Sequence, residues 1–266
     1  MTEKSQYKYI YGPVLSWRLG RSLGIDPVSA IQKTCNFDCV YCQAGKTEVF
    51  PRSREIFVPT QALIRELRSL PEVEVDYVTF AGNGEPTLAK NLGEMIRAVR
   101  CVRTDKVAVI TNASLIDRKD VQRDLALADL VEAKLDAFSA DSLRRVNQPS
   151  DAVHWEGIVA GLQAFRKIYQ GHLTLQIMFV AGNKAHAAEI AKTAFTIGAD
   201  EIEINTPLRF SPVKPLSPEE IAEITAVFRS LCGSTTKIRS IYEEKRGKSQ
   251  PFCRESTERR RGKELD

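Results

Sequence analysis

Residues 76–111 read DYVTFAGNGEPTLAKNLGEMIRAVRCVRTDKVAVIT, and this stretch contains the pattern that decides the fold class. It begins and ends with short runs rich in β-branched and aromatic residues, at 76–80 and 106–111, which are typical of strands. Between these runs, apolar residues recur with helical period over 91–102. A strand, a helix and a second strand in this order predict a βαβ unit, in which the two strands lie parallel.

The same alternation continues on both sides of this unit. The other predicted strands are 28–32 (the weakest), 130–135, 173–180 and 201–204, and the other predicted helices are 60–70, 118–128, 154–169, 185–197 and 218–231. Six strand-helix units fit between residues 28 and 231, whereas a complete eight-unit barrel usually needs roughly 250 residues. We therefore expect an incomplete barrel or an open doubly wound sheet. In both architectures the site lies at the carboxyl ends of the strands.

Composition excludes several classes of protein. The chain has 266 residues, of which 43% are hydrophobic and 27% charged, so a packed globular core is expected. No apolar run approaches the roughly 20 residues that cross a bilayer, and the N-terminus lacks the apolar segment of a secretory signal. These features predict a cytoplasmic protein that does not associate with a membrane.

The net charge of +4 is confined to the end of the chain. Residues 237–266 contain ten Lys and Arg against six Asp and Glu, whereas the remaining residues contain 28 of each sign. Residues 245–266 are therefore expected to form a basic, weakly structured tail. Within it, Arg259, Arg260 and Arg261 either contact phosphates or belong to a solvated charged segment.

Three of the six cysteines lie within eight residues. Cys35, Cys39 and Cys42 have the spacing C-x3-C-x-aromatic-C. Three thiolates from one loop can bind three irons of a cubane cluster, and the absence of a fourth cysteine nearby leaves one iron open to an outside ligand. A zinc site and a chance grouping of three buried thiols are the alternatives. Zinc is less favoured because its sites usually contain paired C-x2-C ligands and the nearest histidine, His154, is distant.

The cysteine motif resembles the signature of the radical S-adenosylmethionine (SAM) superfamily. The resemblance implies a [4Fe-4S] cluster bound by Cys35, Cys39 and Cys42, with SAM on the fourth iron as the source of a 5′-deoxyadenosyl radical. It makes Tyr41, which precedes the last cysteine, a cofactor-binding residue. It also implies an α/β fold with a partial (β/α)6 barrel of the TIM type and a short C-terminal extension. The expected division is an extension over 1–27, a core over 28–231 and a basic tail over 232–266.

Three other predicted strand ends resemble parts of the same family's SAM site. The turn Gly82-Asn83-Gly84-Glu85 is similar to the family's "GGE" motif, which holds the amino group of SAM, with Asn83 in place of the first glycine. Asn112 belongs to a turn similar to the family's TN turn. Asp136 is expected at the ribose hydroxyls of SAM. The alternative for Asp136 is an ion pair with Lys134, because residues two apart in a strand face the same way.

Residues 9–215 also resemble stand-alone radical SAM proteins grouped with wyosine-base tRNA synthetases. The similarity includes the LDA segment at 135–137 and the TPLR segment at 206–209, but residues 1–34 contain none of the additional cysteines of the archaeal tRNA enzymes. The resemblance implies hydrogen abstraction from an unidentified substrate, with RNA or another macromolecule favoured, and an external reductant such as flavodoxin or a ferredoxin-like protein. The alternatives are a glycyl-radical-activating or peptide-modifying radical SAM enzyme and a non-catalytic iron–sulfur electron carrier or redox sensor.

Overall fold

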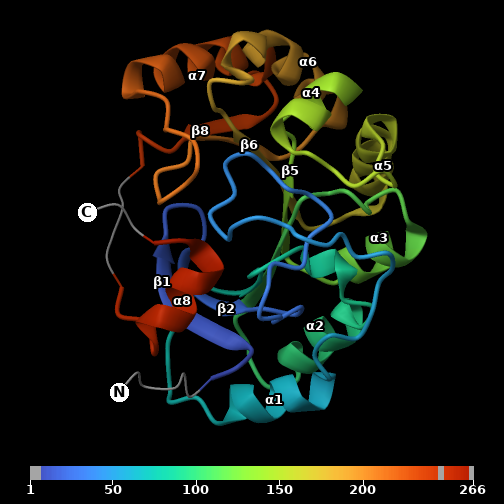
Figure 1. The fold of residues 1–266 in the computed structure, drawn as a ribbon, viewed down its shortest axis with the longest axis vertical. Helices are drawn as coiled ribbons and strands as arrows, with labels where there is room; N and C mark the ends of the chain where they lie inside the picture. Colours follow the sequence, from blue (N-terminus) through green and yellow to red (C-terminus); the bar gives the residue numbers. More distant parts are fainter. Residues whose placement is uncertain (1–6, 245–248, 264–266) are drawn as a thin grey trace.

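The computed structural model describes residues 7–244 and 249–263, which form one eight-stranded sheet in the order β1 to β8 (Figure 1). β1 is antiparallel to β2, and every other neighbouring pair is parallel. The strands are β1 (Ile10–Ser16), β2 (Gly20–Ile25), β3 (Tyr77–Phe80), β4 (Lys106–Thr111), β5 (Leu130–Lys134), β6 (His172–Met178), β7 (Glu201–Asn205) and β8 (Lys237–Ser240).

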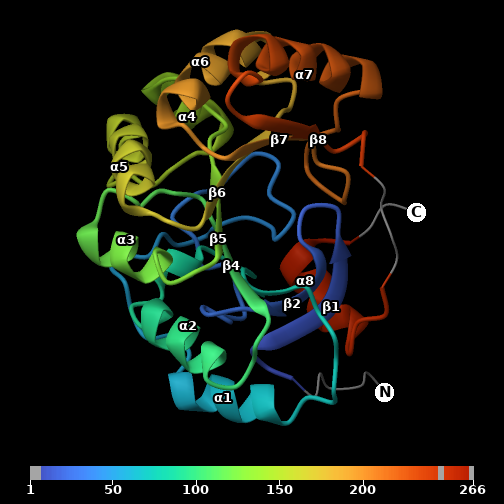
Figure 2. The same cartoon turned by 180° about the vertical axis from the view of Figure 1, so that it is seen from behind.

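Helices surround the sheet on its outer side, and in both views α8 lies beside β1 and β2 (Figures 1 and 2). The helices are α1 (Thr60–Arg68), α2 (Leu92–Arg100), α3 (Lys119–Leu125), α4 (Ala140–Val146), α5 (Trp155–Ile168), α6 (Ala187–Ile197), α7 (Pro218–Cys232) and α8 (Arg254–Arg261), with short 3-10 helices η1 (Pro86–Leu88) and η2 (Lys184–His186). One large apolar core joins the sheet to helices α1 to α7. No helix in the described part of the chain has the length and apolar character needed to cross a membrane.

The strand order decides between the two architectures that the sequence left open. A doubly wound sheet reverses its strand order at a switch point, whereas here each parallel strand lies beside the next one in the chain. This is the winding of a barrel. Since β1 and β8 are the two edges of the sheet, the barrel is not closed within the described residues. The prediction of a partial TIM-type barrel is confirmed.

The predicted helices agree with the structure to within a few residues at each end. The clearest case is α7, where the Ser217 hydroxyl accepts a hydrogen bond from Glu220 N and the Glu220 carboxylate accepts one from Ser217 N, which completes a capping box. Pro218 occupies the first turn, as expected from its missing N–H. Local signals of this kind are sufficient to place a helix start.

The prediction of a strand at 28–32 is wrong. These residues form a loop, and the strand next to β3 is β2, formed by Gly20–Ile25. Gly24 has a packing role in this strand. A Cβ at Gly24 would lie 2.1 Å from Cζ of Tyr11, so only glycine lets the Tyr11 ring cross the strand.

Besides β1, β2 and the two 3-10 helices, three further elements were not expected from the sequence, namely α4, β8 and α8. The expectation of a weakly structured tail is wrong for residues 254–261, because they form α8. This helix is polar on every side, so its sequence contains no apolar periodicity. It is stabilised instead by contacts with the body of the protein, which bury Ser256, Thr257 and Arg260.

Candidate active site

A cavity of about 190 Å³ lies at the carboxyl ends of the central strands. The residue types around it include three thiols, a carboxylate, two amines and two amides. Its lining consists of Lys33, Cys35, Phe37, Cys39, Tyr41, Cys42, Gln43, Ala44, Gly82, Gly84, Glu85, Ile110, Thr111, Asn112, Lys134 and Met178. The site is therefore at the end of the barrel where the sequence analysis expected it.

The loop that contains the three cysteines is fixed by backbone hydrogen bonds from two sides. Val40 N donates to Val146 O at 3.0 Å, which ties the loop to the end of α4. On the other side, Thr34 N donates to Asn83 O at 3.0 Å and Thr34 O accepts from Glu85 N at 2.9 Å. The cysteine loop and the turn after β3 are thus joined immediately before Cys35.

The cysteine side chains lie in a poorly solvated environment. Burial raises the pKa of the Cys35 thiol, and the nearby Glu85 carboxylate raises it further. Burial also raises the pKa of Cys39, to about 11. Because metal ligation requires thiolates, these cysteines need a bound cation to ionise near neutral pH. In residues 7–244 and 249–263, no three His, Cys, Asp or Glu side chains are placed to hold one metal ion together.

The turn after β3 places a buried carboxylate against this loop. Oε1 of Glu85 accepts hydrogen bonds from Thr87 N at 3.0 Å, Thr87 Oγ1 at 2.7 Å and Thr111 Oγ1 at 2.6 Å. Oε2 accepts from Asn112 N at 2.7 Å and from no other described residue, so it keeps a lone pair. Burial raises the pKa of Glu85 although these hydrogen bonds oppose the shift. A ligand ammonium beside Oε2 would offset the cost of the buried charge.

Two contacts explain why residue 84 is a glycine and why a polar residue, Asn112, follows β4. A Cβ at Gly84 would lie 1.9 Å from the carbonyl oxygen of Thr34, so the turn can reach the cysteine loop only with glycine there. Asn112, at the end of β4, donates from Nδ2 to Asn36 Oδ1 at 2.9 Å and contacts Cys35 Sγ at 3.5 Å. Asn112 therefore links the Glu85 carboxylate to the first cysteine.

Asp136 is buried and does not belong to the lining of the cavity. Its Oδ2 accepts hydrogen bonds from the Tyr41 hydroxyl and from Asn147 Nδ2, the latter at 2.7 Å, and its Oδ1 accepts from Met178 N at 2.7 Å. Lys134 lies 3.8 Å from Asp136 but donates to Gln176 Oε1 at 2.6 Å. Burial and the Asp136 charge raise the pKa of Tyr41. The carboxylate thus holds the cysteine loop through Tyr41.

The structure brings together most of the residues that the sequence indicated. All three cysteines, Tyr41, Gly82, Gly84, Glu85 and Asn112 line the cavity. Asn83 lies outside the lining and contributes its backbone, and Asp136 also lies outside it. Sequence reasoning missed Lys33, Gln43 and Asn147. Lys33 pairs with Asp38 at 3.3 Å. Asn147 follows α4, a short helix whose local signals are the N-cap Ser139 and Asp141 in its first turn.

Comparison with known proteins shows which region of the chain is similar to other proteins. The model of the Radical SAM superfamily matches residues 29–194. A UPF0026 protein of Synechocystis is 41% identical over 206 residues, which are 77% of this chain and 77% of that protein. The matched region includes the cysteine loop and the turn after β3.

Two solved structures share the architecture. TYW1 with a lysine-pyruvate adduct bound superposes with a TM-score of 0.63 at 18% identity, over 79% of this chain and 73% of that one. SuiB of Streptococcus suis bound to S-adenosylmethionine superposes with a TM-score of 0.62 at 15% identity, over 82% of this chain and 49% of SuiB. At these sequence identities the structural similarity establishes only a shared fold.

Proposed function

This chain belongs to the radical SAM superfamily, and on that premise we propose that it cleaves SAM reductively with a [4Fe-4S] cluster held by Cys35, Cys39 and Cys42. One observation carries the proposal: these three thiols and the Glu85 carboxylate line a single cavity at the carboxyl ends of the strands. The thiols are the donors that a cluster needs, and the carboxylate is the acceptor that an amino group needs.

The residues present fit the cluster better than a single metal ion. Soft thiolates favour iron–sulfur clusters and zinc. A zinc ion requires its ligands to converge on one point, and no such group exists among the described His, Cys, Asp and Glu side chains. In a cubane each thiolate binds a different iron, so three cysteines need not converge and one iron is left for SAM.

When bound, the cluster and SAM supply the chemistry, in which one electron releases methionine and a 5′-deoxyadenosyl radical that abstracts hydrogen from the substrate. The protein binds and orients them. Oε2 of Glu85 accepts the ammonium group, while Asn112 holds Glu85 against the cysteine loop. We also propose that Asp136 contacts the ribose. Tyr41 and Asn147 donate to its Oδ2 and Met178 N donates to its Oδ1, so the contact uses the remaining lone pair of Oδ1.

For the substrate, we propose a macromolecule, with RNA ahead of a peptide, and an external flavodoxin or ferredoxin-like protein as the electron donor. The support is the resemblance of residues 135–137 and 206–209 to the tRNA-modifying group. Nucleosides and peptide masses from cells with and without the protein test the choice. A difference confined to peptides would replace RNA by a protein substrate.

The proposed reaction is tested with the anaerobically reconstituted full chain. We expect it to hold iron and sulfide, bind SAM and release 5′-deoxyadenosine when dithionite is added. Cys39→Ala removes one ligand and should lose the cluster, whereas Cys101→Ala, an exposed cysteine just after α2, should retain it. A chain with a full cluster that never cleaves SAM would refute the proposal and favour the electron carrier.

A further inference from the structure

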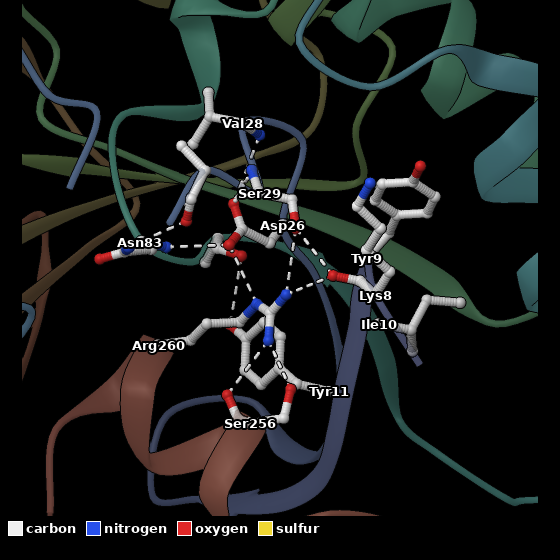
Figure 3. A network of polar contacts seen from close by, with 12 residues as sticks. Lys8, Tyr9, Ile10, Tyr11, Asp26, Val28, Ser29, Asn83, Ser256 and Arg260 are labelled. Carbon is white, nitrogen blue, oxygen red and sulfur yellow. Dashed lines mark hydrogen bonds and ion pairs between the residues drawn. The ribbon is translucent and has the colours of Figure 1, made fainter. Parts of the chain in front are cut away.

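A buried arginine joins the C-terminal helix to the first strands of the sheet. The side chain of Arg260 is 0% exposed and pairs with Asp26, which is also 0% exposed, through Nε at 2.9 Å from Oδ2. Figure 3 shows the guanidinium reaching from α8 across the ring of Tyr11 to Asp26. It also donates to the Lys8 carbonyl and to the Ser29 hydroxyl. Arg260 is therefore part of the core and is not available to solvent.

Asp26 binds the turn of the candidate SAM site with the same oxygen that binds Arg260. Its Oδ2 accepts from Asn83 N at 3.2 Å, and its Oδ1 accepts from Ser29 N at 2.9 Å (Figure 3). A Cβ at Gly82 would lie 2.3 Å from Cγ of Asp26. The carboxylate thus fits directly under residues 82 and 83. One side chain separates Arg260 from the backbone of the turn.

The turn that Asp26 holds is in turn hydrogen-bonded to the cysteine loop. Asn83 O accepts from Thr34 N, and Glu85 N donates to Thr34 O, so residues 83 and 85 flank the residue before Cys35. Tyr11, which lies under Arg260, donates to the carbonyl of Ala81 at 3.3 Å. Arg260 therefore acts on the first part of the turn at two points, on residues 82 and 83 through Asp26 and on Ala81 through Tyr11.

A buried ion pair by itself is weak evidence for a role in stability, because desolvation offsets much of the attraction. Here the Asp26 carboxylate has a second role, since it accepts a hydrogen bond from the backbone N–H of Asn83 in the turn. Rotation of an unpaired Asp26 toward solvent would remove that hydrogen bond. Both Asp26 and Arg260 lie outside the residues 29–194 that match the superfamily model. The contact thus lies outside the region that the superfamily model covers.

We propose that Arg260 is a positioning residue that acts through Asp26 to hold residues 82–85 in the conformation that binds SAM. The SAM part of this inference rests on the proposed function. The inference also excludes Arg260 as one of the tail arginines that contact phosphates, because its guanidinium is bound inside the protein. Exposed Arg259, on the same helix, provides a matched control.

The first experiment uses the full chain without cluster or SAM and measures amide hydrogen exchange. In Arg260→Met, peptides covering 81–88 should exchange about tenfold faster, as expected for the loss of one charge-assisted hydrogen bond. Peptides of β4 should be unchanged, and Arg259→Met should match the wild type. Equal acceleration in β4 would indicate general destabilisation and overturn the proposal, as would unchanged exchange over 81–88.

The second experiment measures SAM binding to the reconstituted chain well below its unfolding temperature. Arg260→Met should raise the Kd for SAM about tenfold with unchanged iron content. If its unpaired Asp26 prevents folding, the Asp26→Asn/Arg260→Met variant removes both charges and is expected to show the same two effects. Wild-type exchange and affinity in that variant would overturn the inference. Failure of the wild type to bind SAM would instead overturn the proposed function.

Discussion

Glu85 connects three segments of the candidate site through one carboxylate. It accepts hydrogen bonds from the turn that contains it, from Thr111 in β4 and from the backbone of Asn112. The motif predicted Glu85 near the cofactor, but two of these partners, Thr111 and Asn112, are 26 and 27 positions away in the sequence. A negative charge that is buried and still has an unused lone pair is unusual unless a cation binds beside it.

Substitution of Glu85 by glutamine tests whether a cation binds beside this carboxylate. Glu85→Gln keeps the volume but removes the charge that attracts an ammonium group, so the Kd for SAM should rise roughly 10- to 100-fold, as expected for a hydrogen bond between charged groups. Iron content should be unchanged. The measurement is equilibrium binding to the reconstituted chain, with Glu94→Gln on the exposed side of α2 as the control. Unchanged affinity would show that Glu85 does not meet the ligand.

Among the elements, the β1–β2 hairpin depends on tertiary contacts more than its sequence suggests. The Tyr11 ring from β1 covers Gly24 of β2, and this close approach keeps Tyr11 beneath Arg260. Burial raises the pKa of the Tyr11 phenol to about 12. Without the packing, a strand that reads GRSLGI has few features that distinguish it from a loop.

Gly24→Ala should therefore destabilise the protein by about 1–3 kcal/mol, the usual cost of forcing an extra carbon into a packed position. Urea unfolding measures the change. Gly182→Ala is a suitable control, since its nearest neighbour would be Val146 Cγ2 at 4.0 Å. If both variants were equally stable, the hairpin would tolerate separation of the Tyr11 ring from β2.

At the scale of the whole molecule, side chains bridge the two edges that the sheet leaves unpaired. Arg239 of β8 donates from Nη2 to the carbonyl of Trp17 at 2.6 Å, and its guanidinium lies 5.3 Å from the centre of the Trp17 ring. Trp17 belongs to the turn between β1 and β2. Arg239 also pairs with Glu201 of β7 at 3.0 Å. These contacts connect the last strand to the first hairpin at the amino end of the barrel.

The charge on Glu201 predicts how stability depends on pH. Burial alone would raise the pKa of Glu201, but His172, Lys237 and Arg239 lower it to about 2. A lowered carboxyl pKa stabilises the folded state above the unfolded pKa, roughly 4.3, and this contribution is lost as pH falls toward 2. Wild type and Glu201→Gln should therefore differ in unfolding free energy by on the order of 3 kcal/mol at pH 7.

Urea titrations from pH 7 to the lowest pH at which both proteins stay folded measure this difference. It should be constant above about pH 5 and shrink progressively below it. A difference that does not change with pH would mean that Glu201 acts through packing rather than through its charge.

The sequence by itself determined the alternation of strands and helices, the position of the cysteine loop and the identity of eight of the sixteen residues that line the cavity. The alternation follows from periodicity and capping, the cysteine loop from its spacing, and the other predicted lining residues from their resemblance to the motifs of the superfamily. The tertiary structure alone decided that β2 is a strand, that α8 is a helix, and that Asn147 and Asp136 support the site from outside the cavity lining. The physical reason is that each depends on atoms distant in sequence. Gly24 requires the ring of Tyr11, and α8 requires the burial of Arg260 against Asp26.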